Sequence, residues 1–213
     1  MKKFKAIQIA AIILFASLLG GMIVGTDVYG EVERQITRVL CLSCAKLNYR
    51  TTVEFQFETV DDMNHPDFVL ENLTKGVVFL HYSADACKGC DEIFPIVKDF
   101  FNVEYGKNDM FYSMTDFEGS DIPYIYNNVD HTTREMQDSY NVYDLDGQGA
   151  RPMIVIVTLS YNRGPIQPHF ASIYGTFGDN DEERVEFLNQ VLQESISKYE
   201  EFKDAYNPEQ KKD

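Results

Sequence analysis

Positive charge is scarce in this sequence of 213 residues, which holds 19 lysines and arginines against 34 aspartates and glutamates, for a formal net charge of −15. Such an acidic chain repels phosphate backbones, which argues against nucleic-acid binding. Internal repeats and low-complexity segments are also absent. The 44% of hydrophobic and 25% of charged residues are typical of a folded globular protein rather than a disordered one. The length suits one ordinary domain with additional segments.

Long apolar runs are equally scarce, and a single one, Ala6 to Gly25, has membrane-spanning length. Its roughly 20 residues match the roughly 30 Å of a bilayer core. Three lysines among residues 2–5 precede it. A cleaved signal peptide is the main alternative, but the run lacks an A-x-A-like cleavage site. We therefore predict an uncleaved signal-anchor transmembrane helix over residues 1–26 in the cell membrane, with a cytoplasmic N-terminus and the remaining chain extracytoplasmic.

Cysteine is rare as well: the chain has 4, arranged as two C-x-x-C pairs. The pair Cys87 and Cys90 follows an apolar, strand-like run that begins at Val77, and precedes apolar residues at helical spacing. This pattern predicts a strand that leads into a helix with the C-x-x-C on its first turn. Unpaired N–H groups and the positive end of the macrodipole at such a helix start favour a thiolate at Cys87.

The remaining patterns predict an α/β domain with a central mixed sheet flanked by helices. Thr52–Glu58 alternates strictly between apolar and polar residues, as a half-buried strand does. Glu118–Asn128 contains a glycine and a proline and is predicted to be irregular. Met153–Leu159 is expected to be a fully buried strand. Further strands are expected at 109–117 and 169–177, and helices at 61–75, 87–103, 130–140 and 180–199.

This order of elements resembles the thioredoxin family over residues 50–206. Pro95 follows Cys90 by five residues, as a proline does in that family, and Pro152 stands where the family has a cis proline before its fourth strand. The resemblance implies a thioredoxin-like fold for this part of the chain. Residues 27–49 then form a juxtamembrane segment and residues 207–213 a polar tail. Ala84, Tyr140-Asn141-Val142 and Gly175 match further family positions.

The resemblance also implies roles for the two cysteines. Cys87 is expected to attack a disulfide as a thiolate, and Cys90, a turn deeper, to resolve the mixed disulfide. Lys88 and Gly89 lie between them and tune the thiolate, which the positive charge of Lys88 favours. From the residues alone, a permanent disulfide and half of a zinc site are the alternatives.

Other positions set the environment of this pair. The residue before the cis proline faces the C-x-x-C in the family, so Arg151 is expected to do so here. Pro152 leaves neighbouring backbone groups free to hold an extended substrate peptide. Two positions depart from the family: Ala86 replaces a tryptophan, and His81 replaces a buried acid. His81 is either a core histidine or the proton acceptor for Cys90, a role that its ordinary pKa of about 6.5 suits.

The second pair, Cys41 and Cys44, lies in the juxtamembrane segment, outside the thioredoxin-like unit. Three interpretations stay open: a redox pair that exchanges electrons with Cys87 and Cys90, a two-thiol metal half-site completed by a dimer, and a structural disulfide. The leading hypothesis is a juxtamembrane dithiol that relays electrons or joins two chains into a dimer.

Together these features predict a membrane-anchored, outward-facing thiol–disulfide oxidoreductase that uses no cofactor and no metal. The expected partners are cysteine-containing exported proteins and an unidentified redox partner. A thioredoxin-fold binding module without turnover and a thiol metal-binding protein are the alternatives. The direction of the reaction does not follow from the sequence.

Overall fold

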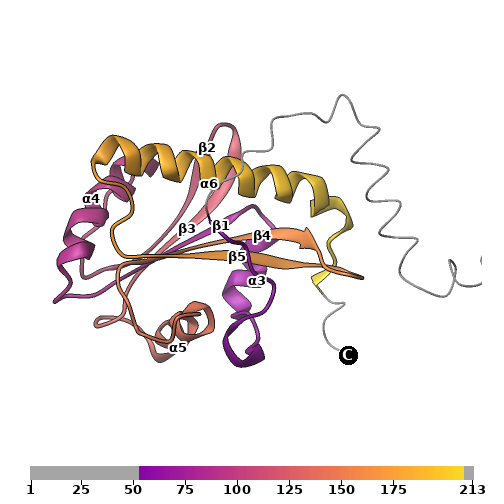
Figure 1. The fold of residues 1–213 in the computed structure, drawn as a ribbon, viewed down its shortest axis with the longest axis horizontal. Helices are drawn as coiled ribbons and strands as arrows, with labels where there is room; N and C mark the ends of the chain where they lie inside the picture. The colour runs from indigo at the N-terminus through magenta and orange to yellow at the C-terminus, as the bar shows by residue number, and fades with distance from the viewer. Residues whose placement is uncertain (1–52, 209–213) are drawn as a thin grey trace, which may run out of the picture. The chain divides into compact units, whose positions relative to one another are not determined.

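A mixed five-stranded sheet forms the centre of the computed structural model, which describes residues 53–208 (Figure 1). The strand order is β2-β3-β1-β4-β5, and β1 pairs in parallel with β3 and antiparallel with β4. The predicted α/β class with a mixed sheet is therefore confirmed. The strands are β1 (Val78–Ser83), β2 (Met110–Phe117), β3 (Ser120–Asn128), β4 (Met153–Tyr161) and β5 (Ile166–Tyr174).

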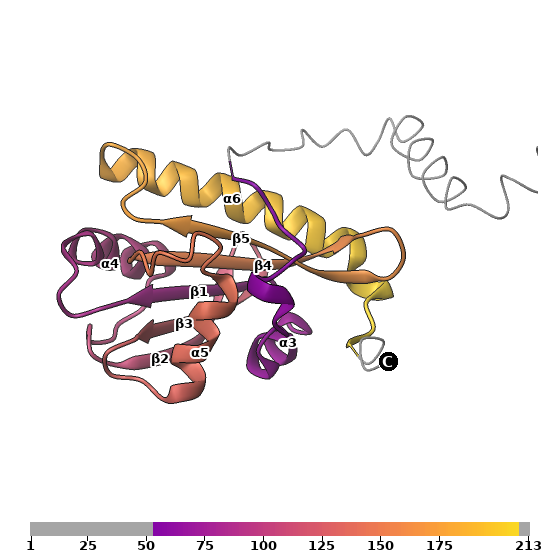
Figure 2. The same ribbon diagram turned by 60° about the horizontal axis from the view of Figure 1, so that its bottom comes forward.

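Helices cover both faces of this sheet (Figures 1 and 2). One face carries α4 and α6, and the other carries α3 and α5. Ring contacts from β1 match this layering: Phe79 meets Phe101 of α4 with centroids 4.8 Å apart, and Tyr82 meets Tyr140 of α5 at 5.4 Å. The helices are α3 (Asp67–Leu73), α4 (Lys88–Phe101), α5 (Arg134–Tyr143) and α6 (Asp181–Phe202), with short 3-10 turns at Val60–Asp62 and Lys203–Ala205.

The central strand β1 is buried at every residue. A strand with helices on both faces and neighbours on both edges has no polar side to show, which is why its sequence is a nearly continuous apolar run. The predicted helix after it is also confirmed, because α4 begins at Lys88 and buries Ile93, Val97 and Phe101. The chain therefore passes from the middle of the sheet directly into the first turn of α4.

The prediction that residues 118–128 are irregular is wrong. Ser120–Asn128 forms β3, which lies between β2 and β1 and is buried over most of its length. Glu118 and Gly119 both have positive φ, at 53° and 85°, and make the two-residue turn from β2 to β3. Such turns match the twist of a hairpin and usually carry Asn-Gly or Asp-Gly, so Glu-Gly gave a weak signal.

The predicted strand at 52–58 is also absent from the sheet. Within the described part of this segment, Gln56 makes a single antiparallel bridge with Phe170 of β5. Phe57 lies beside that bridge, with its ring stacked on His169 at 4.2 Å. The alternation thus marks side chains that contact an outer strand, without a ladder of backbone bonds. Two other elements are shifted or shortened: α3 begins only after Pro66, and β5 begins three residues before the predicted 169–177.

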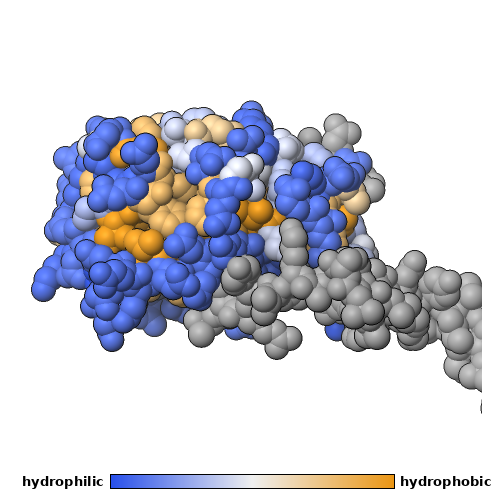
Figure 3. Space-filling model, turned by 90° about the horizontal axis from the view of Figure 1, so that it is seen from above, coloured by the Kyte–Doolittle hydropathy of each residue, from blue (hydrophilic) through white to orange (hydrophobic). Residues whose placement is uncertain are grey.

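Apolar residues gather on the face that carries α6, seen from above in Figure 3. A hollow between α4 and α6 there is lined by Ile96, Phe100, Phe117 and Val185. Within residues 53–208, no helix is both long and apolar enough to cross a membrane. The predicted signal-anchor and the juxtamembrane segment, residues 1–49, lie outside the described residues.

Candidate functional site

Cys87 and Cys90 lie at the start of α4 and form a disulfide, with sulfurs 1.99 Å apart. Cys87 caps the helix: its backbone is extended, and its Sγ accepts a hydrogen bond from the Cys90 N–H at 3.1 Å. The sulfur thus satisfies one of the N–H groups that a helix start leaves unpaired. A thiolate at Cys87 would receive the same hydrogen bond and the positive end of the helix dipole.

The two cysteines differ in their exposure to solvent. Cys87 is partly exposed, whereas Cys90, in the first turn of the helix, is 0% exposed. Only Cys87 is therefore open to attack from outside, or able to attack an external disulfide. This asymmetry is the one that the roles expected for an attacking and a resolving cysteine require.

Pro152 lies beside the C-x-x-C, as the sequence resemblance implies. The Arg151–Pro152 peptide bond is cis. A Cβ atom built on Gly89 would be 3.1 Å from Pro152 Cδ and 3.4 Å from Thr176 Cγ2, so the helix start contacts both residues. Gly89 is the residue type that permits this close approach between the two backbone segments.

The two basic residues that are expected to tune the thiolate, Lys88 and Arg151, have different surroundings. Lys88 is exposed on the first turn of α4. Arg151 is also exposed, and its guanidinium lies over the ring of Tyr140, 4.8 Å from the centroid. The backbone carbonyl of Arg151 lies near Gly89, 3.9 Å from a Cβ atom built on that residue. The Arg151 guanidinium thus has an aromatic partner, and the expectation that it faces the cysteines stays a prediction.

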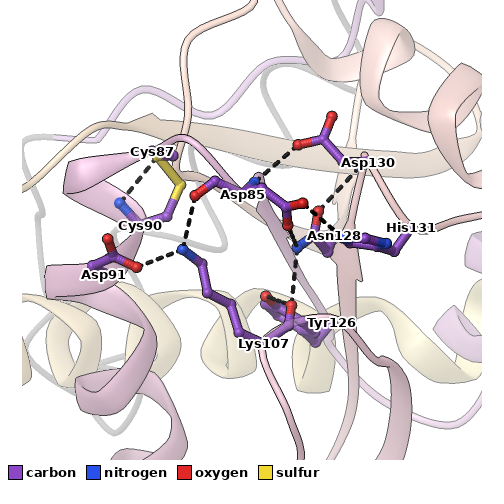
Figure 4. Close-up of polar contacts among 9 residues, drawn as sticks. All are labelled: Asp85, Cys87, Cys90, Asp91, Lys107, Tyr126, Asn128, Asp130 and His131. Atoms are coloured by element: carbon purple, nitrogen blue, oxygen red, sulfur yellow. Dashed lines mark hydrogen bonds and ion pairs between the residues drawn. A yellow bond between two sulfur atoms is a disulfide. The ribbon is translucent and has the colours of Figure 1, made fainter.

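A lysine that sequence reasoning missed ties this site together (Figure 4). The Lys107 ammonium donates to the carboxylate of Asp91 at 2.5 Å and to the backbone carbonyl of Asp85 at 3.2 Å. Asp85 lies in the loop before Cys87, and Asp91 lies in the first turn of α4. One side chain therefore links both chain segments that flank the disulfide, and places a positive charge between them.

The loop before Cys87 is also held by Asn128, the last residue of β3, and by residues that follow this strand. Asn128 donates to one oxygen of Asp85 at 3.0 Å, and His131 Nε2 lies 2.7 Å from the other. The hydrogen bond from Asn128, followed by that from His131, lowers the pKa of Asp85. The Asn128 amide also reaches the Lys107 carbonyl at 3.0 Å, and Asp130 accepts the Asp85 N–H at 2.9 Å.

His81 is a core residue on the face of β1 that α4 covers. It is 0% exposed, and its ring meets Tyr126, which in turn meets Phe94 of α4. Nδ1 lies 3.3 Å from the Tyr124 hydroxyl, while Nε2 has no hydrogen-bond partner among the described residues. Burial lowers the pKa of His81 to about 3. Burial and the lowered pKa favour the core-histidine interpretation, and the role as proton acceptor for Cys90 stays a prediction.

The second pair of cysteines and the question of a metal site remain to be placed. Cys41 and Cys44 lie outside residues 53–208, so their three interpretations stay predictions. Within residues 53–208, no three histidine, cysteine, aspartate or glutamate side chains are grouped in a way that could hold a metal ion.

No protein-family model, curated protein or solved structure matches this chain. The interpretation of the site therefore rests on its own residues and their geometry.

The charges around the disulfide predict opposite effects for two substitutions. Lys107→Met removes a cation and leaves Asp91 without its partner, so less of the reduced Cys87 is ionised at pH 7. Asp91→Asn removes the anion and leaves Lys107 in place, so more of the reduced Cys87 is ionised. Because the pair is partly exposed, we expect changes of about two- to fivefold in the rate of Cys87 alkylation at pH 7.

Lys98→Met is the matched control, because Lys98 makes an ion pair with Glu104, at 2.8 Å, at the other end of α4. It should leave the alkylation rate unchanged. If Lys107→Met and Asp91→Asn shift the rate in the same direction, the electrostatic account of the site fails.

Burial of neutral His81 predicts acid sensitivity. Its pKa is about 3 in the folded chain against about 6.5 unfolded, so the unfolded chain binds more protons between these pH values. Stability should thus fall as the pH drops from 6.5 towards 3, with about 3 kcal/mol from this residue lost by pH 4. Urea unfolding at pH 7 and pH 4 should show a smaller loss in His81→Asn. Tyr124→Phe, which keeps the imidazole buried, should retain the wild-type loss; equal losses in all three proteins would contradict this assignment.

Proposed function

We propose that this protein is a membrane-anchored, outward-facing thiol–disulfide oxidoreductase with a thioredoxin-like fold, which exchanges disulfides with exported proteins through Cys87 and Cys90. The observation that carries the proposal is the asymmetry of the pair. A partly exposed sulfur caps the helix, and a fully buried sulfur lies one turn below it within bonding distance. Such a pair can react with an external disulfide at one sulfur only, and can then close on itself.

The arrangement of the elements supports the thioredoxin-like assignment. A central strand runs into the C-x-x-C helix, a proline beside the motif opens an antiparallel hairpin of β4 and β5, and α6 follows. One departure concerns the sheet edge. The expected order placed a strand at 52–58, whereas the edge next to β3 is formed by β2, through the hairpin after α4.

In the reductive direction, the Cys87 thiolate attacks one sulfur of a substrate disulfide. A mixed disulfide forms, and the other substrate sulfur leaves as a thiolate. The Cys90 thiol then loses its proton and attacks Cys87 Sγ, which breaks the mixed disulfide and releases the second substrate thiolate. Two electrons have passed from the cysteine pair to the substrate, whose thiolates take up protons. The same steps in reverse oxidise a substrate dithiol.

Backbone groups beside the disulfide suit an extended peptide. The Pro152 carbonyl is already used, because it accepts the Gly175 N–H at 2.8 Å. The Arg151 carbonyl, next to Gly89, has no hydrogen-bond partner among the described residues and is the group we assign to a substrate N–H. Binding through backbone groups would give affinity without selecting a particular side chain. This suits an enzyme that acts on several exported proteins.

Trapping tests this proposal. In the full chain with Cys41→Ser and Cys44→Ser, so that the second pair cannot react, Cys90→Ser leaves Cys87 without its resolving partner, and mixed disulfides with partner proteins should accumulate through Cys87. Exchange is stopped with acid and the free thiols are then alkylated. Non-reducing electrophoresis should reveal the mixed disulfides as species that a reductant dissociates.

Cys87→Ser is the matched control, since it keeps a single thiol at the same helix start. It should trap nothing, because Cys90 is 0% exposed. Absence of mixed disulfides in both variants would favour a binding module without turnover. Equal trapping by both would show that the two sulfurs have no distinct roles.

A further inference from the structure

The loop Asp144–Gly149, between α5 and β4, contains a carboxylate oxygen that lacks a partner. Asp144 is only 7% exposed, and one of its oxygens accepts the Gly149 N–H at 2.9 Å. The other oxygen, Oδ1, is buried and makes no hydrogen bond within the described residues. Burying a carboxylate oxygen is costly unless a hydrogen bond, an opposite charge or a metal ion compensates it.

Oxygen-bearing side chains alternate along this loop. Asp144, Asp146 and Gln148 occupy its first, third and fifth positions, and all but Asp144 are exposed. Gly149, at the sixth position, has φ +64°, the left-handed conformation that a sharp turn needs. Calcium-binding loops supply oxygen ligands from the first, third and fifth positions, a backbone carbonyl from the seventh, and a glycine at the sixth for the turn. Here the seventh position is Ala150.

We propose that this loop binds a hard divalent cation of the Ca²⁺ class. The ligands would be Asp144 Oδ1, the Asp146 carboxylate, the Gln148 side-chain oxygen and the Ala150 carbonyl, with water completing the shell. This all-oxygen set suits Ca²⁺ and does not suit Zn²⁺ or other metals that prefer nitrogen and sulfur. The cation would compensate the buried Asp144 Oδ1, which makes no hydrogen bond within the described residues.

The site is expected to be weak. The twelfth position of a calcium-binding loop carries a bidentate glutamate, whereas here it is Val155, buried in β4. With two carboxylates only, we expect a dissociation constant of about 10⁻⁴ to 10⁻³ M, the range of extracellular calcium modules. Such an affinity fits the predicted location of this domain outside the cell. The site is independent of the redox chemistry proposed for the cysteines.

Terbium luminescence tests this site in the full chain. The chain has 13 tyrosines and no tryptophan, so excitation reaches Tb³⁺ through tyrosine alone. Tyr140 donates to the Ala150 carbonyl at 2.8 Å, and the Asp146 N–H points to the Tyr174 hydroxyl at 3.5 Å, so two rings touch the loop. We expect saturable Tb³⁺ luminescence that Ca²⁺ removes.

Asp144→Asn should weaken Tb³⁺ and Ca²⁺ binding at least about tenfold. The amide can still accept the Gly149 N–H, so the loop is expected to fold. Asp146→Asn changes an exposed side chain and should also weaken binding, which keeps the test valid if Asp144→Asn does not fold. Asp138→Asn, in exposed α5 surface, is the control and should bind like wild type. Wild-type protein without saturable binding, or loop variants that bind as wild type does, would overturn the proposal.

Discussion

Burial of β1 on both faces is the constraint on which the rest of this structure depends. All six residues of the strand are buried between the α4 and α5 layers and between β3 and β4. Because packing fixes β1 on both faces and both edges, it also fixes the position of the end of this strand, after which α4 begins. The position of Cys87 at the helix start is thus determined by packing some distance away from the sulfur itself. The packed core thus fixes where the disulfide lies.

Electrostatics complete the site in a chain that is strongly acidic. Asp85 and Asp91 both lie close to Cys87 in sequence, and alone they would oppose a thiolate there. The Lys107 ammonium contacts both residues and offsets part of this charge. His131 and Asn128 engage the carboxylate of Asp85 from the other side. The two carboxylates are therefore held by hydrogen bonds and ion pairs, and they are not free negative charges beside the sulfur.

Sequence reasoning predicted those parts of the fold whose signal is local and strong. The β1–α4 unit, β4 and α6 carry long apolar patterns with matching caps, and each was placed within a few residues. The strand β3 was missed because its turn uses Glu118-Gly119 and because Pro123 and two asparagines interrupt its apolar pattern. Its position between β2 and β1 depends on distant partners, which a local pattern does not contain.

The candidate site likewise contains residues that the sequence could predict and residues that it could not. Cys87, Cys90 and Pro152 could be found because their spacing is fixed along the chain and carries a chemical reason. Lys107 could not be found, since it lies in a turn 16 residues after Asp91 and meets it only through the fold. The contact of the Arg151 guanidinium with the Tyr140 ring could not be found for a related reason, because it too depends on the fold.

The reduction potential of the Cys87–Cys90 pair is the most direct test of the central claim. Equilibration with dithiol or glutathione buffers, in a Cys41→Ser/Cys44→Ser background so that one pair alone reports, would give this value from the alkylated fractions. The account predicts a reversible two-electron transition between about −270 and −120 mV, the range of thiol–disulfide oxidoreductases. A potential below about −300 mV would identify a structural disulfide that resists exchange, and would contradict the account.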